Sequence, residues 1–214
     1  MSVMSPELLS VNVGRPRTVP RGKATVRTAI WKHPIEGPAA ARGVNLEGDD
    51  QADRAVHGGP DKAIYAYARE DTAWWEAELG RALGPGAFGE NLTVAGLDLA
   101  TMEVGRRWRV GSAVLEVSQP RLPCFKLGLR FGDPRMLKRF AAAGRTGTYL
   151  RIVEEGSLAA GDAIEVGPAP GHGVTVALIA DAYLRDHALA ARMLAAPQLP
   201  AGWRKWAQRH SEAA

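Results

Sequence analysis

Short runs of alternating hydrophobic and polar residues fill most of the first 170 positions, and glycine or proline separates one run from the next. Alternation at this period predicts strands, because successive side chains of a strand point to opposite faces. The strands predicted in this way cover residues 8–13, 23–31, 44–46, 63–67, 149–153 and 163–166. Residues 104–118, interrupted by Gly111, predict a hairpin, and residues 15–22, which contain Pro16 and Pro20, predict a loop.

Two segments of this first part have a helical pattern instead. Residues 71–83 place Trp74, Trp75 and Leu79 at helical spacing before a Gly-Pro-Gly stop. A second helix is predicted from Asp133 to about residue 143, because an aspartate followed by a proline is typical of a helix start.

The pattern changes after residues 167–171 (GPAPG), which have the composition of a linker. From residue 174 onward, alanine, leucine and arginine predict three short helical segments, with Trp203 and Trp206 on the apolar face of the last one. We therefore predict two domains, residues 1–168 and 169–214. The fold class is α+β and predominantly β: a closed or nearly closed β-barrel with flanking helices, followed by a small helical subdomain.

Composition and charge narrow the classes of function. With 214 residues, 46% of them hydrophobic and 23% charged, the chain can bury a core. The net charge of +4 invites nucleic-acid binding, but the cations are scattered and no aromatic-basic motif accompanies them, so we expect an anionic small molecule and no nucleic acid. No secretory signal is recognisable, and no apolar run approaches the roughly 18 residues of a membrane span, so we expect a cytoplasmic protein without membrane contact.

Cys124 is the single cysteine of the chain, which excludes an internal disulfide and a cluster that needs four cysteines. Pro120 and Pro123 stiffen the backbone that leads to it. Arg121 and Lys126 raise the local positive potential, which favours the thiolate, the form that binds metals. The alternative is a buried thiol packed as a small apolar group.

Residues 57–59 (HGG) form a second candidate site. Two glycines permit a backbone nest that binds an oxyanion, with charge added by Arg54, His57 and Lys62. The alternative is a plain hairpin turn with a surface histidine.

Asn91, in a Gly-Glu-Asn sequence, could face a planar heterocycle, because an amide both donates and accepts hydrogen bonds; alternatively it caps the next strand. Four aspartates nearby lack the ligand order of a calcium loop, and solvated turns are expected instead at Asp49, Asp50, Asp53 and Asp61.

Four segments indicate a particular protein family when they are taken together and in order, although none does so alone. They are residues 48–54 (GDDQADR), 57–63 (HGGPDKA), 86–93 (GAFGENLT) and 118–124 (SQPRLPC). They resemble the MOSC domain family, in particular its bacterial YiiM-type branch. The resemblance extends from about residue 8 to residue 166, and the tail resembles the three-helix extension of that branch.

The resemblance implies a MOSC-type barrel that binds the molybdenum cofactor (molybdopterin). It implies that Cys124 is the catalytic residue and the protein ligand to molybdenum, that Asn91 contacts the pterin, and that Arg121 is the arginine of the motif. From charge and the glycine turn we add further cofactor-binding candidates: Arg54, His57, Gly58, Lys62 and Lys126.

The activity implied is reduction of N-hydroxylated compounds, such as hydroxylaminopurines, to amines. A single cysteine cannot hold an iron–sulfur cluster, so electrons are expected from a separate reductase. Two alternatives remain: a sulfur carrier with a persulfide on Cys124, and a basic binding module without catalysis. The oligomeric state is left open.

Overall fold

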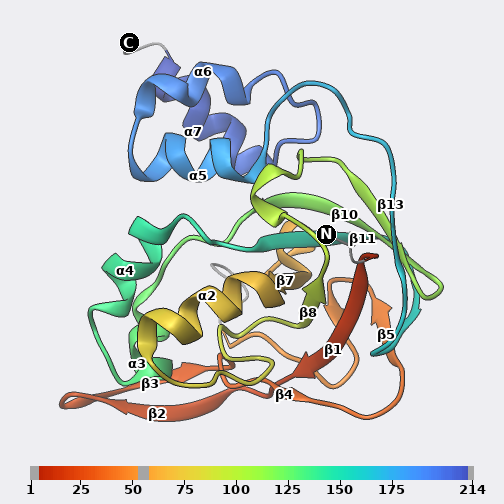
Figure 1. Ribbon diagram of the computed structural model, residues 1–214. Helices are drawn as coiled ribbons and strands as arrows, with labels where there is room; N and C mark the ends of the chain where they lie inside the picture. Colours follow the sequence, from red (N-terminus) through yellow and green to blue (C-terminus); the bar gives the residue numbers. More distant parts are fainter. Residues whose placement is uncertain (1–4, 53–57, 212–214) are drawn as a thin grey trace.

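The computed structural model describes residues 5–52 and 58–211. Its main sheet has eight strands, which are β1 (Glu7–Val13), β4 (His33–Pro34), β7 (Ile64–Ala68), β8 (Leu92–Ala95), β9 (Arg107–Val110), β10 (Ala113–Pro120), β11 (Thr148–Glu154) and β13 (Ile164–Val166). The spatial order is β13-β9-β10-β11-β7-β8-β1-β4 (Figure 1). All neighbours are antiparallel except β7 and β8, which run parallel.

Two smaller sheets complete the β-structure. One contains β5 (Ala39–Arg42), β6 (Asn45–Leu46) and β12 (Gly156–Leu158), and the other is the hairpin of β2 (Arg17–Arg21) and β3 (Ala24–Thr28). The prediction of a loop over residues 15–22 is therefore wrong. Proline is tolerated in β2 because a strand of a two-stranded ribbon has one edge that needs no donor.

The main sheet does not close fully into a barrel, so of the two predicted forms, closed or nearly closed, the closed one is wrong. Within the described residues, β13 and β4 remain its edge strands. An isolated bridge, Glu7 to Ala163, links β1 to the segment before β13. Closure is incomplete because two short segments share the outer edge of β1. The segment before β13 pairs with β1 at Glu7, and β4 pairs with β1 at Asn12 and Val13.

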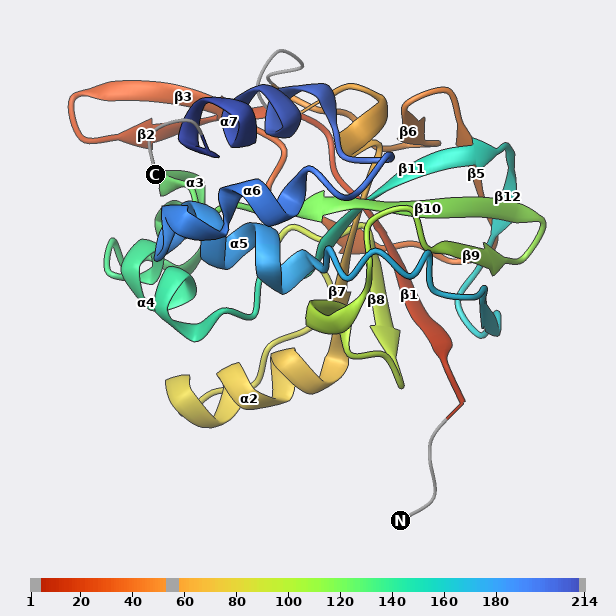
Figure 2. The ribbon, with the colours of Figure 1, turned by 90° about the horizontal axis from the view of Figure 1, so that it is seen from above.

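Three helices cover one side of the main sheet: α2 (Arg69–Leu79), α3 (Phe125–Phe131) and α4 (Met136–Ala143). Both views show them away from β12 and β5 (Figure 2). An aromatic cluster built around Tyr67, Trp75, Phe88 and Phe140 fills the space beneath them. A separate aliphatic core, which includes Leu8, lies within the sheet. Two short 3-10 helices are η1 (Pro60–Lys62) and η2 (Leu99–Thr101).

The tail forms the predicted helical group, which lies at the end of the molecule opposite the β2–β3 hairpin (Figure 1). It contains α5 (Val176–Leu184), η3 (His187–Leu189), α6 (Ala190–Met193) and α7 (Ala201–Ser211). These elements bury their own apolar cluster, to which Val104 of the preceding part also belongs. The domain boundary at residue 168 stays a prediction. No helix in the described part of the chain is long and apolar enough to cross a bilayer.

Candidate functional site

Cys124 lies four residues after the end of the fully buried strand β10, at the position that precedes α3. Its free thiol is half-buried. A cavity of about 90 Å³ and a groove of about 580 Å³ meet at Cys124, Lys62 and Tyr149, which border both. The alternative of a thiol enclosed in the apolar core is therefore wrong. We call these two spaces the inner cavity and the outer groove.

Arg121 brings a buried positive charge to the inner cavity. It is 7% exposed, and its guanidinium lies over the rings of Tyr65 and Phe140, with Cζ 5.3 and 5.4 Å from the ring centroids. Burial alone would lower the pKa of Arg121, but its interactions with Tyr65 and Cys124 outweigh this effect and raise it. Its buried Nη1 has no hydrogen-bond partner among the described residues. An unsatisfied charged donor at a cavity wall suits an anionic ligand.

Two lysines add to this charge. Lys126 on α3 borders the inner cavity, is 9% exposed and forms no ion pair with any described residue. Lys62 ends η1; burial lowers the pKa of Lys62, while the charge of Asp61 opposes this change. A buried cation is costly without a counter-charge, so an anion bound beside Lys126 would be stabilised by it.

Lys32 and Asp49 form a buried ion pair that also borders the inner cavity, and the sequence did not single it out. The Asp49 side chain is 1% exposed and accepts hydrogen bonds from Lys32 Nζ at 2.5 and 2.6 Å. It also accepts from Gly14 N at 2.8 Å. Burial lowers the pKa of Lys32, and Asp49 opposes that change. The prediction of a solvated turn is therefore wrong for Asp49; Asp53 lies outside the described residues.

The Gly-Glu-Asn segment borders the inner cavity through Gly89 and Asn91. Asn91 Nδ2 donates to Asp49 Oδ2 at 2.9 Å and to Asn12 O at 3.2 Å, and its Oδ1 accepts from Tyr65 N at 3.1 Å. Glu90 is buried and accepts from two backbone N–H groups of its own loop; burial raises the pKa of Glu90. Both N–H groups of the Asn91 amide are thus held by the protein, and its contact with the pterin stays a prediction.

The structure brings most of the predicted site residues together. The inner cavity is bordered by Asn91, Lys62, Arg121, Cys124 and Lys126. Gly58 borders the outer groove instead. Arg54 and His57 lie outside the described residues, so their predicted roles are not tested.

The inner-cavity residues that the sequence did not predict as site residues include Lys32, Asp49, Tyr65 and Tyr149. Asp49 could have been found, because it lies in residues 48–54, one of the segments that carry the family resemblance. Lys32 has no comparable signal.

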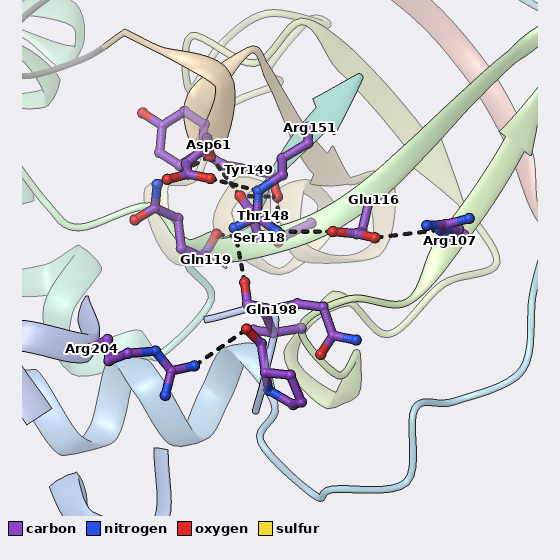
Figure 3. A network of polar contacts seen from close by, with 12 residues as sticks. Asp61, Arg107, Glu116, Ser118, Gln119, Thr148, Tyr149, Arg151, Gln198 and Arg204 are labelled. Carbon is purple, nitrogen blue, oxygen red and sulfur yellow. Dashed lines mark hydrogen bonds and ion pairs between the residues drawn. The ribbon is translucent and has the colours of Figure 1, made fainter. Parts of the chain in front are cut away.

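A polar network ties the outer groove to the strand that leads to Cys124 (Figure 3). Gln119 Nε2 donates to Asp61 O at 3.1 Å, and Gln119 Oε1 accepts from Trp203 Nε1 at 2.5 Å. Arg151 donates to Asp61, to Glu116 and to the backbone oxygen of Gln198. The tail, η1 and β10 are therefore held in one arrangement.

The described residues contain no group of three or more His, Cys, Asp or Glu side chains that could hold a metal ion. A metal at this site would take Cys124 as its protein ligand from the described part of the chain. Thiolates are soft ligands, which suits a sulfur-rich metal cofactor.

The model of the MOSC domain family matches residues 53–165. The protein YflK from Bacillus subtilis is 43% identical to this chain, over 74% of this chain and 72% of YflK. Protein YiiM from Escherichia coli is 34% identical, over 74% of this chain and 70% of its own length. A Gibberella moniliformis protein named reductase is 35% identical over 74% of this chain, which corresponds to 29% of that longer protein.

The crystal structure of YiiM from Geobacillus stearothermophilus has a similar fold. It superimposes with a TM-score of 0.79 at 31% sequence identity, and the match covers 96% of this chain and 98% of that one. The similarity thus includes the helical tail as well as the main sheet.

Proposed function

The chain belongs to the MOSC domain family, and on that premise we propose that it is a molybdenum-cofactor-dependent reductase of N-hydroxylated compounds such as hydroxylaminopurines. One observation carries the proposal: Cys124 borders a cavity that is also lined by the buried Arg121, whose Nη1 has no hydrogen-bond partner among the described residues. A soft metal ligand beside an unsatisfied cation fits a cofactor that combines a sulfur-bound metal with a phosphate.

The residues present fit this cofactor in charge and in ligand type. Cys124 would hold the metal, while Arg121, Lys126 and Lys62 would face its anionic groups. At about 90 Å³, the inner cavity is smaller than ordinary cofactor sites of roughly 300 Å³ or more, so a bound cofactor would extend beyond it. When bound, the cofactor supplies two-electron chemistry, and the chain supplies binding and orientation.

The overall reaction takes up two electrons and two protons: R–NHOH + 2e⁻ + 2H⁺ gives R–NH₂ + H₂O. The N–O bond breaks, the nitrogen is reduced and the oxygen leaves as water. We propose that the electrons come from a separate reductase, because the single cysteine of this chain cannot hold an iron–sulfur cluster. A free cysteine in a catalytic role also supports a reducing, cytoplasmic location.

Metal and pterin analysis of protein purified from a molybdenum-replete host tests this proposal. We expect near-stoichiometric molybdenum and pterin in the wild type, and loss of molybdenum and of N-hydroxylamine reduction in Cys124→Ser. The fold should survive, because the Cys124 side chain makes no capping hydrogen bond to α3. Circular dichroism provides the control for folding. Full reduction by Cys124→Ser would rule out the metal-ligand role.

A sulfur carrier is the second candidate, and the exposure of Cys124 to the wide outer groove favours it. A persulfide on Cys124 could meet a sulfur acceptor there. The same preparation separates the two functions: a carrier would hold cyanide-labile sulfur on Cys124 and no stoichiometric molybdenum.

A further inference from the structure

The outer groove has walls of two different origins. One wall comes from η1 and the segment that connects β10 to Cys124, and it includes Pro60 and Leu122. The other wall comes from the helical tail, with Tyr183 of α5 and Trp203, Trp206 and Arg209 of α7. Because Cys124 borders the same space, a molecule that fills this groove contacts both the aromatic side chains of the tail and the region of the thiol.

The aromatic wall is preorganised by contacts within the protein. Trp203 is fixed by its hydrogen bond to Gln119, and Tyr183 packs edge-on against it at 5.4 Å between ring centroids. Trp206 lies 5.9 Å from Trp203 and stacks on His210 at 4.2 Å. Tyr183 nevertheless remains 41% exposed. Exposed aromatic surface in a concave site favours a flat apolar ligand, which stacks at little entropic cost.

The charge of Arg209 bears on the class of ligand that the groove takes. Arg209 borders the groove, and the carboxylate of Asp61 is already engaged by Arg151 at 2.5 Å. The guanidinium of Arg209 therefore favours a neutral or anionic ligand over a cationic one.

We propose that the outer groove is the substrate site, and that Tyr183, Trp203 and Trp206 select flat heteroaromatic compounds that carry the N–OH group on one edge of the ring. The helical tail would then be a specificity element. This inference rests on the proposed function for its chemistry. The binding of a planar base does not depend on it.

Binding is tested by quenching of tryptophan fluorescence with 6-aminopurine, the amine product of such a substrate. The protein is titrated as purified from hosts with and without molybdenum cofactor. The variants are Trp206→Ala and Tyr183→Ala, and the matched control is Gln208→Ala, an exposed residue of α7 that does not border the groove. Stacking of a base on an aromatic side chain predicts an affinity loss of about tenfold in each variant, and an unchanged affinity in the control.

Selectivity is tested on the loaded enzyme with 6-hydroxylaminopurine and N-hydroxyurea, a small non-aromatic substrate. We expect the ratio of kcat/KM for the purine over that for N-hydroxyurea to fall about tenfold in Trp206→Ala. Purine binding by cofactor-loaded enzyme that reduces neither N-hydroxylated compound would refute the proposed function and leave the groove assignment standing. Unchanged quenching in both variants, or a loss of bound pterin from them, would overturn the assignment, since the latter places the cofactor's own ring on this surface.

Discussion

At the scale of single residues, the ion pair of Lys32 and Asp49 has the largest energetic consequence. Both side chains are nearly inaccessible to solvent, and Asp49 also accepts from Gly14 N and Asn91 Nδ2. Removing one member of such a pair costs more than the pair contributes, because the other charge stays buried without a partner.

We predict that Asp49→Asn lowers the free energy of unfolding by about 3 kcal/mol at pH 7. Asp181→Asn is the matched control: its partner Arg185 lies on the surface, so a loss of about 0.5 kcal/mol or less is expected. Urea unfolding measures both changes. Equal effects at the two positions would contradict the role of burial.

The same variant has a defined pH dependence. Burial lowers the pKa of Lys32 below the value of 10.5 for an exposed lysine, so the unfolded chain binds more protons between these two values. Stability therefore rises with pH through that window. Without the Asp49 carboxylate the pKa of Lys32 falls further, so the pH window in which stability rises becomes wider. The difference in free energy of unfolding between the wild type and Asp49→Asn should therefore become smaller between pH 7 and pH 9.5. A gap that grows with pH would contradict this prediction.

The residues of the candidate site could be predicted from the sequence where a short local motif contains them. Cys124, Arg121 and Lys126 were identified because prolines and cations surround one cysteine within a few positions. Lys32 was not, because its burial depends on Asp49, seventeen residues away, and a lone lysine has no local signature. The burial of Asp49 likewise depends on distant partners.

At the scale of elements, Gly147 shows how closely β11 approaches β7. Its φ is 61°, and a Cβ there would lie 2.5 Å from the backbone oxygen of Ala66. Gly22, in the turn between β2 and β3, has nearly the same φ of 59° but open space around it.

Alanine variants at these two positions therefore distinguish the cost of backbone strain from the cost of steric overlap. Gly22→Ala should cost about 1 kcal/mol, the usual penalty for a left-handed alanine. Gly147→Ala should cost about 3 kcal/mol or more, because the strands must also move apart. Thermal unfolding of both variants gives the comparison, and similar losses would show that the sheet yields at little cost.

The elements themselves were largely predictable, since alternation and turn residues are local signals. Residues 104–118 form the predicted hairpin of β9 and β10, and the tail forms helices broken near His187 and at the prolines. β2 was missed because its pairing with β3 offsets Pro20, which lies within the strand, and Pro16, which lies directly before it. Full closure of the barrel could not be predicted, because it depends on which residues of β1 pair with β4 and which pair with the segment before β13.

At the scale of the whole molecule, Arg151 joins three parts of the chain (Figure 3). From β11 it donates to Asp61 Oδ1 at 2.5 Å, to Glu116 Oε1 at 2.9 Å and to Gln198 O at 2.9 Å. Arg107 contacts the same Glu116 at 3.4 Å, but its side chain is 60% exposed.

We predict that Arg151→Gln destabilises the protein by about 3 kcal/mol and increases amide hydrogen exchange in both η1 and residues 196–203. Arg107→Gln should change stability by less than about 1 kcal/mol and leave that exchange unchanged. Hydrogen exchange followed by mass spectrometry measures the coupling. An effect confined to η1 would mean that the tail is held independently of Arg151.

The bridge between Glu7 and Ala163 has a consequence for biosynthesis. Strand β1 pairs through Leu8 with Val94 and reaches its last neighbour in the sequence at Ala163. At about 5–20 residues per second, translation leaves β1 without that neighbour for roughly ten seconds or longer. A nascent chain stalled before that point would present an open hydrogen-bonding edge, so slow codons upstream of position 163 should raise the fraction that aggregates.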